Sequence, residues 1–330
     1  MKAIKFFAIS AMAAAMITSC STDDELSQSN YPSDNIVRVT AGVNNAKTRA
    51  EGAGTEMKKD FSLTIVNKNA PKYTYTDKVF SKTSGDWACS ETLLWQKSDA
   101  LVDIVAFAPA QTGKFNGVYA NGSIQPIAYS VASDQSSDQS TSSDNNDLLY
   151  YYAKDFNPGE SLDKGKLNIQ FNHAFCMIDI VVTLGTEFNK PEVLKESPIV
   201  KVTLGGTKIA ANVDVTKAAS VVTVSETDAA TDITTTKGSF DKAANAEANA
   251  ISRFSCIAIP QTVAGKTFKV SLMTAGKRYE WTSDKEITLQ SGYRYTLNLS
   301  MGNDVVLLKG GSITATPWTE ITSDKPLETD

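Results

Sequence analysis

Short runs in which apolar and polar residues alternate fill the chain after residue 30, and Gly, Asn, Asp and Lys interrupt them. This period of two is typical of antiparallel strands with one buried face, and long helical periods are few. The first run covers residues 36–43, and these apolar residues lie on one of its faces: Val37, Val39, Ala41 and Val43. Residues 101–108 are apolar on both faces, which predicts a buried central strand. We therefore expect an all-β fold of mostly antiparallel strands with few or no long helices.

A change of phase interrupts the alternation in the middle of the chain. Apolar residues occupy odd positions in 167–175 and even positions in 178–184. A strand can change its buried face only through a bulge or a bend, so we predict an irregularity between His173 and Met177.

The length of 330 residues is sufficient for two domains of ordinary size. We predict one set of strands over residues 36–165, with an exposed polar loop at 132–147, and a second set over 166–322. A polar tail follows at 323–330.

The N-terminus has the three parts of a secretion signal: a basic start with Lys2 and Lys5, an apolar run over 6–17, and small residues before Cys20. The run is too short and too rich in alanine for a membrane span. Residues 17–20 resemble a bacterial lipobox, in which the cysteine is acylated, so Cys20 is the candidate lipidation residue. The alternative is an ordinary signal peptide with a chance cysteine.

Asp23, Asp24 and Glu25 follow in a polar segment, 21–35, that is typical of a solvated tether. Their position behind a lipobox resembles the export signal of surface-displayed lipoproteins in Bacteroides-like bacteria.

Composition excludes several classes of site. The net charge is only −5 and the lysines are scattered, which argues against a nucleic-acid surface. Cys89, Cys176 and Cys256 are too widely and irregularly spaced for a disulfide scaffold or a zinc site; we expect Cys176 and Cys256 in the core and leave the role of Cys89 open. His173 is the only histidine, and we interpret it as a hydrogen-bonded packing residue. We predict no catalytic residue, no metal and no cofactor.

Several separated segments together resemble the fimbrillin family, the subunits of type V pili of Bacteroides-like bacteria. They are the lipobox, Thr48-Arg49-Ala50, VDIVAFAP at 102–109, DLLY at 147–150, FNHAFCMIDIVV at 171–182, and SGYRYTLNLSMGNDVVLLKGGSITATPW at 291–318. The resemblance implies two transthyretin-like β-sandwich domains in tandem, which agrees with the two sets of strands.

The resemblance also implies a mechanism of assembly. A lipidated precursor reaches the outer membrane, where an arginine-specific protease cuts after the first strand and leaves an open groove with unpaired backbone groups. A C-terminal strand of the next subunit fills the groove by β-augmentation, and repetition head to tail builds a filament with a role in adhesion. The implied partners are other pilin subunits, the protease, and the outer membrane through the lipid.

On this sequence, residues 36–43 become the removable strand and Arg49 the cut site, because Arg49 lies in the polar segment 44–54. Arg38 is a competing site, although a cut there would leave half of the strand attached. The candidate donor strand is residues 312–322, with Ile313, Ala315 and Ile321 on one side. Pro317 would interrupt its hydrogen bonds, as fits an edge or exchanged strand.

Three alternatives stay open. The chain could be a non-polymerising tip or anchor subunit of the same pilus, or a surface glycan-binding lipoprotein, which predicts a row of exposed aromatic side chains. An enzyme, in particular a glycoside hydrolase, would need two facing carboxylates. For the last, the first acids to inspect are Glu91, Asp103 and Asp179.

Overall fold

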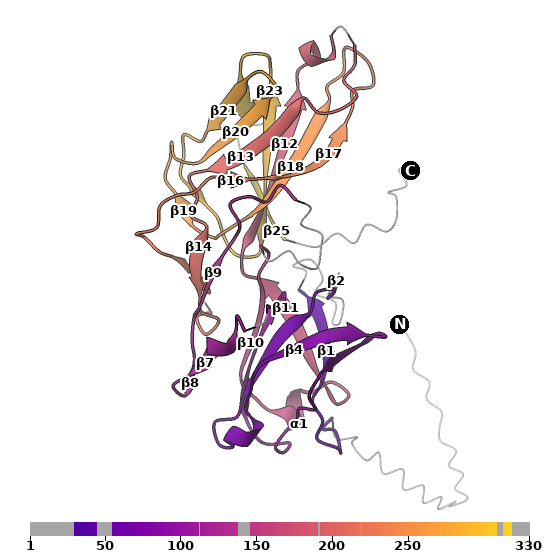
Figure 1. Ribbon diagram of the computed structural model, residues 1–330, viewed down its shortest axis with the longest axis vertical. Coiled ribbons are helices and arrows are strands. Elements are labelled where there is room, and N and C mark those ends of the chain that lie inside the picture. The colour runs from indigo at the N-terminus through magenta and orange to yellow at the C-terminus, as the bar shows by residue number, and fades with distance from the viewer. Residues whose placement is uncertain are drawn as a thin grey trace, which may run out of the picture.

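A computed structural model describes residues 30–44, 55–111, 113–137, 146–190, 192–218, 220–308 and 313–318. Within these ranges nearly all regular structure is strand, which confirms the predicted all-β class. The helices are short: α1 (Pro158–Ser161) and the 3-10 turns η1 (Pro71–Tyr73), η2 (Asn116–Val118) and η3 (Thr186–Asn189). The molecule is elongated, with the earlier strands gathered at one end and the later strands at the other (Figure 1).

The earlier strands form one eight-stranded sheet, here called the N-terminal sheet, in the order β2–β1–β11–β10–β6–β3–β4–β5. Its strands are β1 (Arg38–Val43), β2 (Thr55–Glu56), β3 (Phe61–Val66), β4 (Tyr75–Thr83), β5 (Asp86–Cys89), β6 (Val102–Ala108), β10 (Leu149–Phe156) and β11 (Lys166–His173). Neighbours are antiparallel except β1 and β11, which run parallel. The β4–β5 hairpin turns through Ser84 and Gly85, whose φ angles of 51° and 100° suit a two-residue turn.

The N-terminal sheet curls around a hydrophobic cluster. Phe61, Ile104 and Phe171 are among the fully buried members of this cluster. The two sides of the sheet approach each other: β1 contacts β5, and Lys166 Nζ on the neighbouring strand β11 lies 3.8 Å from Asp86 Oδ1 on β5. Strand β6 is buried along its whole length and contributes to both cores, so the predicted two-faced central strand is confirmed.

The later strands form two facing sheets, here called the C-terminal sandwich. One has the order β17–β18–β12–β23–β24 with β25 also paired to β23, and the other has the order β16–β13–β20–β21. Their strands are β12 (Cys176–Leu184), β13 (Ile199–Gly205), β16 (Ile233–Thr234), β17 (Thr236–Asp241), β18 (Ile251–Ala258), β20 (Lys269–Thr274), β21 (Arg278–Thr282), β23 (Tyr293–Met301), β24 (Val306–Leu308) and β25 (Thr314–Pro317). A short pair, β19 (Thr262–Val263) with β22 (Ile287–Thr288), lies beside them.

Strict alternation explains the core of this sandwich. Even positions of β12 from Ile178 to Leu184 and odd positions of β23 from Tyr295 to Met301 are buried, and both sets join one cluster. Cys176 and Cys256 are buried in the same cluster as free thiols, as predicted.

A three-stranded sheet joins the two ends of the molecule. It has the order β15–β14–β9, with β9 (Ile127–Ser130), β14 (Ala210–Val213) and β15 (Val222–Val224). Strand β9 follows the small hairpin of β7 (Tyr119–Ala120) and β8 (Ser123–Ile124), so a segment from the first half of the chain pairs with the second half.

The predicted break between His173 and Met177 is confirmed, since β11 ends at His173 and β12 begins at Cys176. Strand β11 pairs only with strands of the N-terminal sheet among the described residues. We therefore propose that the division between the two parts falls at residues 174–175 rather than at 165–166.

Candidate functional site

Strand β1 is held mainly by one long parallel pairing. Six consecutive residues pair with β11, from Arg38 opposite Lys166 to Val43 opposite Phe171. On its other side β1 pairs with β2 over only two residues, Gly42 and Val43. Within the sheet, strand β1 is therefore held by an extensive pairing with β11 and by a much shorter pairing with β2.

The side chains of β1 divide as the alternation predicts. Val37, just before the strand, and Val39 and Val43 within it are at most 6 % exposed, and Ala41 is half-buried against the same cluster. Arg38 and Thr40 point to solvent. The residues of β11 that pair with Val39, Ala41 and Val43 are fully buried: Leu167, Ile169 and Phe171. Loss of β1 would thus uncover both an apolar surface and the unpaired backbone edge of β11.

Backbone hydrogen bonds fix both ends of this segment. The N–H of Val37 donates to the carbonyl oxygen of Leu93 at 2.9 Å, and the N–H of Trp95 donates to that of Asn35 at 2.8 Å. At the other end, Asn44 follows β1; its N–H donates to the carbonyl oxygen of Phe171 at 2.8 Å, and its amide Nδ2 donates to Asn172 Oδ1 at 2.9 Å.

Arg38, the competing cut site, lies inside this pairing. Its guanidinium lies 2.5 Å from Asp34, and the hydrogen bonds that Asp34 accepts from Arg38 and from the N–H of Ile36 lower the pKa of Asp34 to about 2. Arg49 and Cys20 lie outside the described residues.

The C-terminal segment is placed against its own sandwich. Strand β25 pairs antiparallel with residues 293–296 of β23, and Pro317 lies in this ladder opposite Tyr293. All four side chains of β25, including Ala315, are exposed, whereas Ile313 is half-buried against the sandwich core. Ile313 and Ala315 therefore do not share one buried face in this arrangement, and Ile321 lies outside the described residues.

Trp318, the residue after β25, is buried. Its ring stacks on His173 with the ring centroids 3.8 Å apart and the planes inclined by 12°. The backbone N–H of Trp318 donates to the carbonyl oxygen of Gly292 at 2.7 Å, and the residue is 6 % exposed. The alternation around His173 could not predict this contact, because the two rings are far apart in the sequence, His173 near the middle and Trp318 near the C-terminus.

His173 forms a buried hydrogen-bonded pair with Asp147 at the junction of the two parts of the molecule. Its Nδ1 lies 2.9 Å from Asp147 Oδ1, and the side chains of His173 and Asp147 are 2 % and 10 % exposed. Burial opposes the ionisation of Asp147, but the charge and hydrogen bond of His173, together with the charge of Lys59, outweigh it and lower the pKa of Asp147.

Replacing Asp147 by Asn is expected to lower the free energy of unfolding at pH 7 by about 1–3 kcal/mol, because buried His173 loses its charged partner. Since the pKa of Asp147 is lowered on folding, its contribution is complete above the unfolded value of about 4 and is lost as the pH falls through the folded value. The difference between wild type and Asp147→Asn in urea titrations should therefore shrink below about pH 4. If the difference in unfolding free energy between the two proteins stayed constant down to pH 2, this linkage would be contradicted. If the difference disappeared at neutral pH in 0.5 M salt, the pair would be shown not to be buried.

The three acids considered for catalysis are each paired with a base, and they come from different parts of the fold. Glu91 lies 2.8 Å from Lys78 Nζ, and Asp179 is held by the guanidinium of Arg294. Asp103 on β6 lies 2.7 Å from Lys68 Nζ. None of these pairs provides the two facing carboxylates of a glycoside hydrolase.

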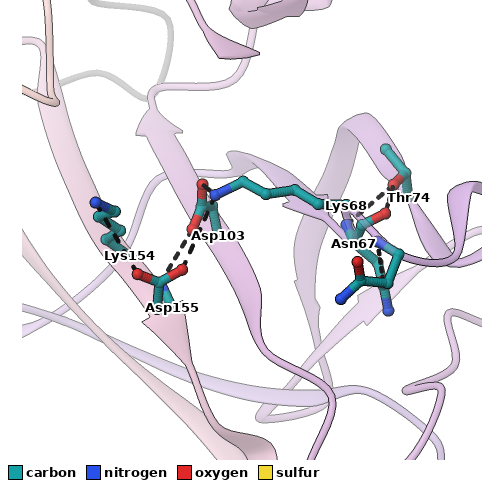
Figure 2. A network of polar contacts seen from close by, with 7 residues as sticks. Asn67, Lys68, Thr74, Asp103, Lys154 and Asp155 are labelled. Carbon is teal, nitrogen blue, oxygen red and sulfur yellow. Dashed lines mark hydrogen bonds and ion pairs between the residues drawn. The ribbon is translucent and has the colours of Figure 1, made fainter. Parts of the chain in front are cut away.

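The network around Asp103 is structural (Figure 2). Lys68, which follows β3, also lies 3.9 Å from Asp155 Oδ1, and the N–H of Asp155 donates to Asp103 Oδ1 at 3.0 Å. The hydrogen bond to Asp103 raises the pKa of Lys68. The ammonium group thus ties the end of β3 to β6 and to the irregular part of β10 between Ala153 and Phe156.

Two adjacent depressions of about 270 and 310 Å³ lie beside the three-stranded sheet and share Lys114, Tyr129 and Ser130 in their walls. Their linings contain one carboxylate, that of Asp228. In the described part of the chain, no three His, Cys, Asp or Glu side chains gather as metal ligands would. No helix within the same ranges has the length and apolar character needed to cross a membrane.

Comparison with known proteins gives a match over most of the chain. A family model described as fimbrillin-like matches residues 48–318. No curated protein matches the chain at a significant level.

Solved structures of low sequence identity share the fold. A candidate cell adhesion protein from Bacteroides ovatus is 16 % identical with a TM-score of 0.59, and the alignment covers 87 % of this chain and 98 % of that one. A candidate cell adhesion protein from Bacteroides uniformis is 15 % identical with a TM-score of 0.53, with 87 % and 100 % covered. These likenesses support the arrangement of strands described above.

Proposed function

The chain belongs to the fimbrillin-like family, a family of structural pilus and cell-adhesion proteins rather than enzymes, and we propose that it is a pilus subunit whose β1 is removed to admit a strand of the next subunit. The observation that carries this proposal is the placement of β1. It forms six pairs with β11 and only two with β2, and its valines fill the core of the N-terminal sheet.

Removal of such a strand creates a site for another strand. The exposed edge of β11 offers backbone donors and acceptors along six residues. The positions vacated by the side chains of Val37, Val39 and Val43 form apolar pockets. Backbone bonds would supply affinity and the alternate pockets would supply register. Because donor and acceptor lie on different surfaces of each subunit, the contact is head to tail and does not close.

The remaining steps of the proposal rest on the sequence. Cys20 is lipidated and anchors the precursor in the outer membrane, the acidic tether directs it to the cell surface, and an arginine-specific protease cuts after Arg49. The lipid, the tether and β1 are all on the N-terminal side of that cut, so a single event would release the subunit from the lipid and open the β11 edge.

A tip or anchor subunit is the second candidate, and one observation favours it. Ile313, β25 and Trp318 lie on their own sandwich, so the C-terminal segment is not extended toward a neighbour. The glycan-binding alternative gains no such support, since Tyr73, Tyr75, Tyr150, Tyr151 and Tyr152 are all partly buried.

Treatment of the purified precursor with an arginine-specific protease tests the proposal. We expect N-terminal sequencing to find Ala50 as the new first residue and an SDS gel of unheated samples to show a ladder of polymers. Cleavage after Arg49 without any ladder would overturn the proposal of a polymerising subunit and favour the tip subunit. No cleavage after Arg49 would favour the anchor subunit.

A further inference from the structure

The C-terminal segment is held on its own sandwich by buried Trp318 rather than by β25, whose side chains are exposed. The side chains of β25 are exposed, its ladder with β23 is four residues long, and Pro317 has no N–H to donate. A short edge strand that buries no side chain contributes little to its own retention. Trp318, in contrast, is buried, stacked on His173 and hydrogen-bonded to Gly292.

The surface that receives Trp318 is fixed in position. The ring of His173 is oriented by Asp147 through Nδ1. Gly292, which accepts the Trp318 N–H, donates its own N–H to the carbonyl oxygen of Phe175 at 2.9 Å. Trp318 therefore contacts the last residue of β11 directly, and through Gly292 it is linked to Phe175 in the short break that joins β11 to β12.

The same end of β11 also holds the segment that the proposed cut would remove. His173 is the last residue of β11, and the two residues before it, Phe171 and Asn172, accept the hydrogen bonds of Asn44. Asn44 lies on the N-terminal side of Arg49, so a cut at Arg49 frees Asn44 together with β1. Asn44 and Trp318 thus hold neighbouring positions at one end of one strand.

We propose that the stack of Trp318 on His173 is an autoinhibitory contact that retains the C-terminal segment on its own sandwich while β1 is in place, and that loss of β1 and Asn44 weakens it. This inference rests on the proposed function, in which the C-terminal segment must leave β23 to reach a neighbour. A segment docked within its own chain competes with transfer to another subunit, and the fraction of open segments limits assembly.

Hydrogen exchange of the Thr314–Thr316 amides measures the contact directly in the full chain. In Trp318→Ala we expect these amides to exchange at least about tenfold faster than in wild type before any cleavage, because the aromatic stack is lost. Trp318→Phe, which keeps a ring on His173, should stay close to wild type. In wild type, cleavage after Arg49 should accelerate exchange in the same direction. Unchanged exchange in Trp318→Ala would overturn the retaining role of Trp318, and unchanged exchange after cleavage would overturn the coupling to β1.

The inhibitory effect needs a variant that leaves the C-terminal segment intact. His173→Asn removes the ring under Trp318 but places its amide Nδ2 close to the position of Nδ1, where it can donate to Asp147, and it changes no residue of the donor segment. After protease treatment we expect this variant to polymerise about tenfold faster than wild type. Polymerisation at the wild-type rate, or slower, would overturn the autoinhibitory role. If no variant polymerises at all, the proposed function fails, while the exchange measurement still decides whether Trp318 retains the segment.

Discussion

Arg49→Lys is expected to abolish both cleavage and polymerisation, whereas Arg38→Lys is expected to leave both intact. An arginine-specific protease requires arginine at the cut, and a chain is cut most readily where its backbone is exposed and unpaired. Arg38 does not meet this condition, because β1 is paired with β11 along its length and the Arg38 side chain is bound to Asp34. Arg49 lies between β1 and β2 in a polar stretch of sequence.

The two variants form a matched pair, since each keeps the positive charge and differs only in which arginine is lost. N-terminal sequencing and an SDS gel of unheated samples provide the measurement. If Arg38→Lys stopped cleavage and Arg49→Lys did not, the cut would fall inside β1 and half of the strand would stay in its groove. The proposal of an intact, removable β1 would then be wrong.

Excision of β1 is expected to destabilise the monomer strongly, and a free β1 peptide is expected to restore its stability. Three buried valines at about 1.5–3 kcal/mol each give roughly 5–9 kcal/mol, an upper value because the unfolded chain already buries some of this surface. A loss of about 5 kcal/mol corresponds to a fall in Tm of roughly 10 °C or more. Differential scanning calorimetry of the cleaved chain, with Cys20 removed to avoid lipid, measures this fall.

The rescue separates a specific groove from general damage. A synthetic peptide of residues 35–44 should raise the Tm of the cleaved chain in proportion to the logarithm of its concentration. The same peptide with Val39→Asp should fail, because it would place a charge in the core of the N-terminal sheet. If both peptides restored the Tm equally, the groove would not discriminate between side chains. If excision caused no fall in Tm, β1 would not be part of the stable core.

Local alternation was sufficient to predict which residues of β1 are buried and which strand is apolar on both faces. Alternate residues of a strand point to the same face of the sheet, so Val37, Val39 and Val43 share one face, and this apolar face is the buried one. The break after His173 followed from the change of phase, since a strand cannot move its apolar residues to the other face without an irregularity. These features depend on neighbours in sequence.

The partner of β1 depends on topology and was not predictable from the alternation. A period of two says that one face is buried, but not which strand lies alongside, nor whether the pair is parallel. The stack of Trp318 on His173 is likewise a contact between distant segments. The donor candidates show the same limit: Ile313 and Ala315 share a side of an ideal strand, yet at the edge of β23 Ala315 is exposed to solvent.

The parallel pairing of β1 with β11 also predicts when β1 docks during folding. Thr40 on β1 and Asn168 on β11 are neighbours in the sheet although 128 positions separate them in the chain. Closing so long a loop is slow, and strands that emerge first from the ribosome must wait for late partners. We expect β1 to dock late, after β3, β4, β6 and β10 have paired. If β1 is the last strand added in folding, its later removal breaks no pairing that was formed before it, although the cleaved monomer loses the stability that β1 contributes.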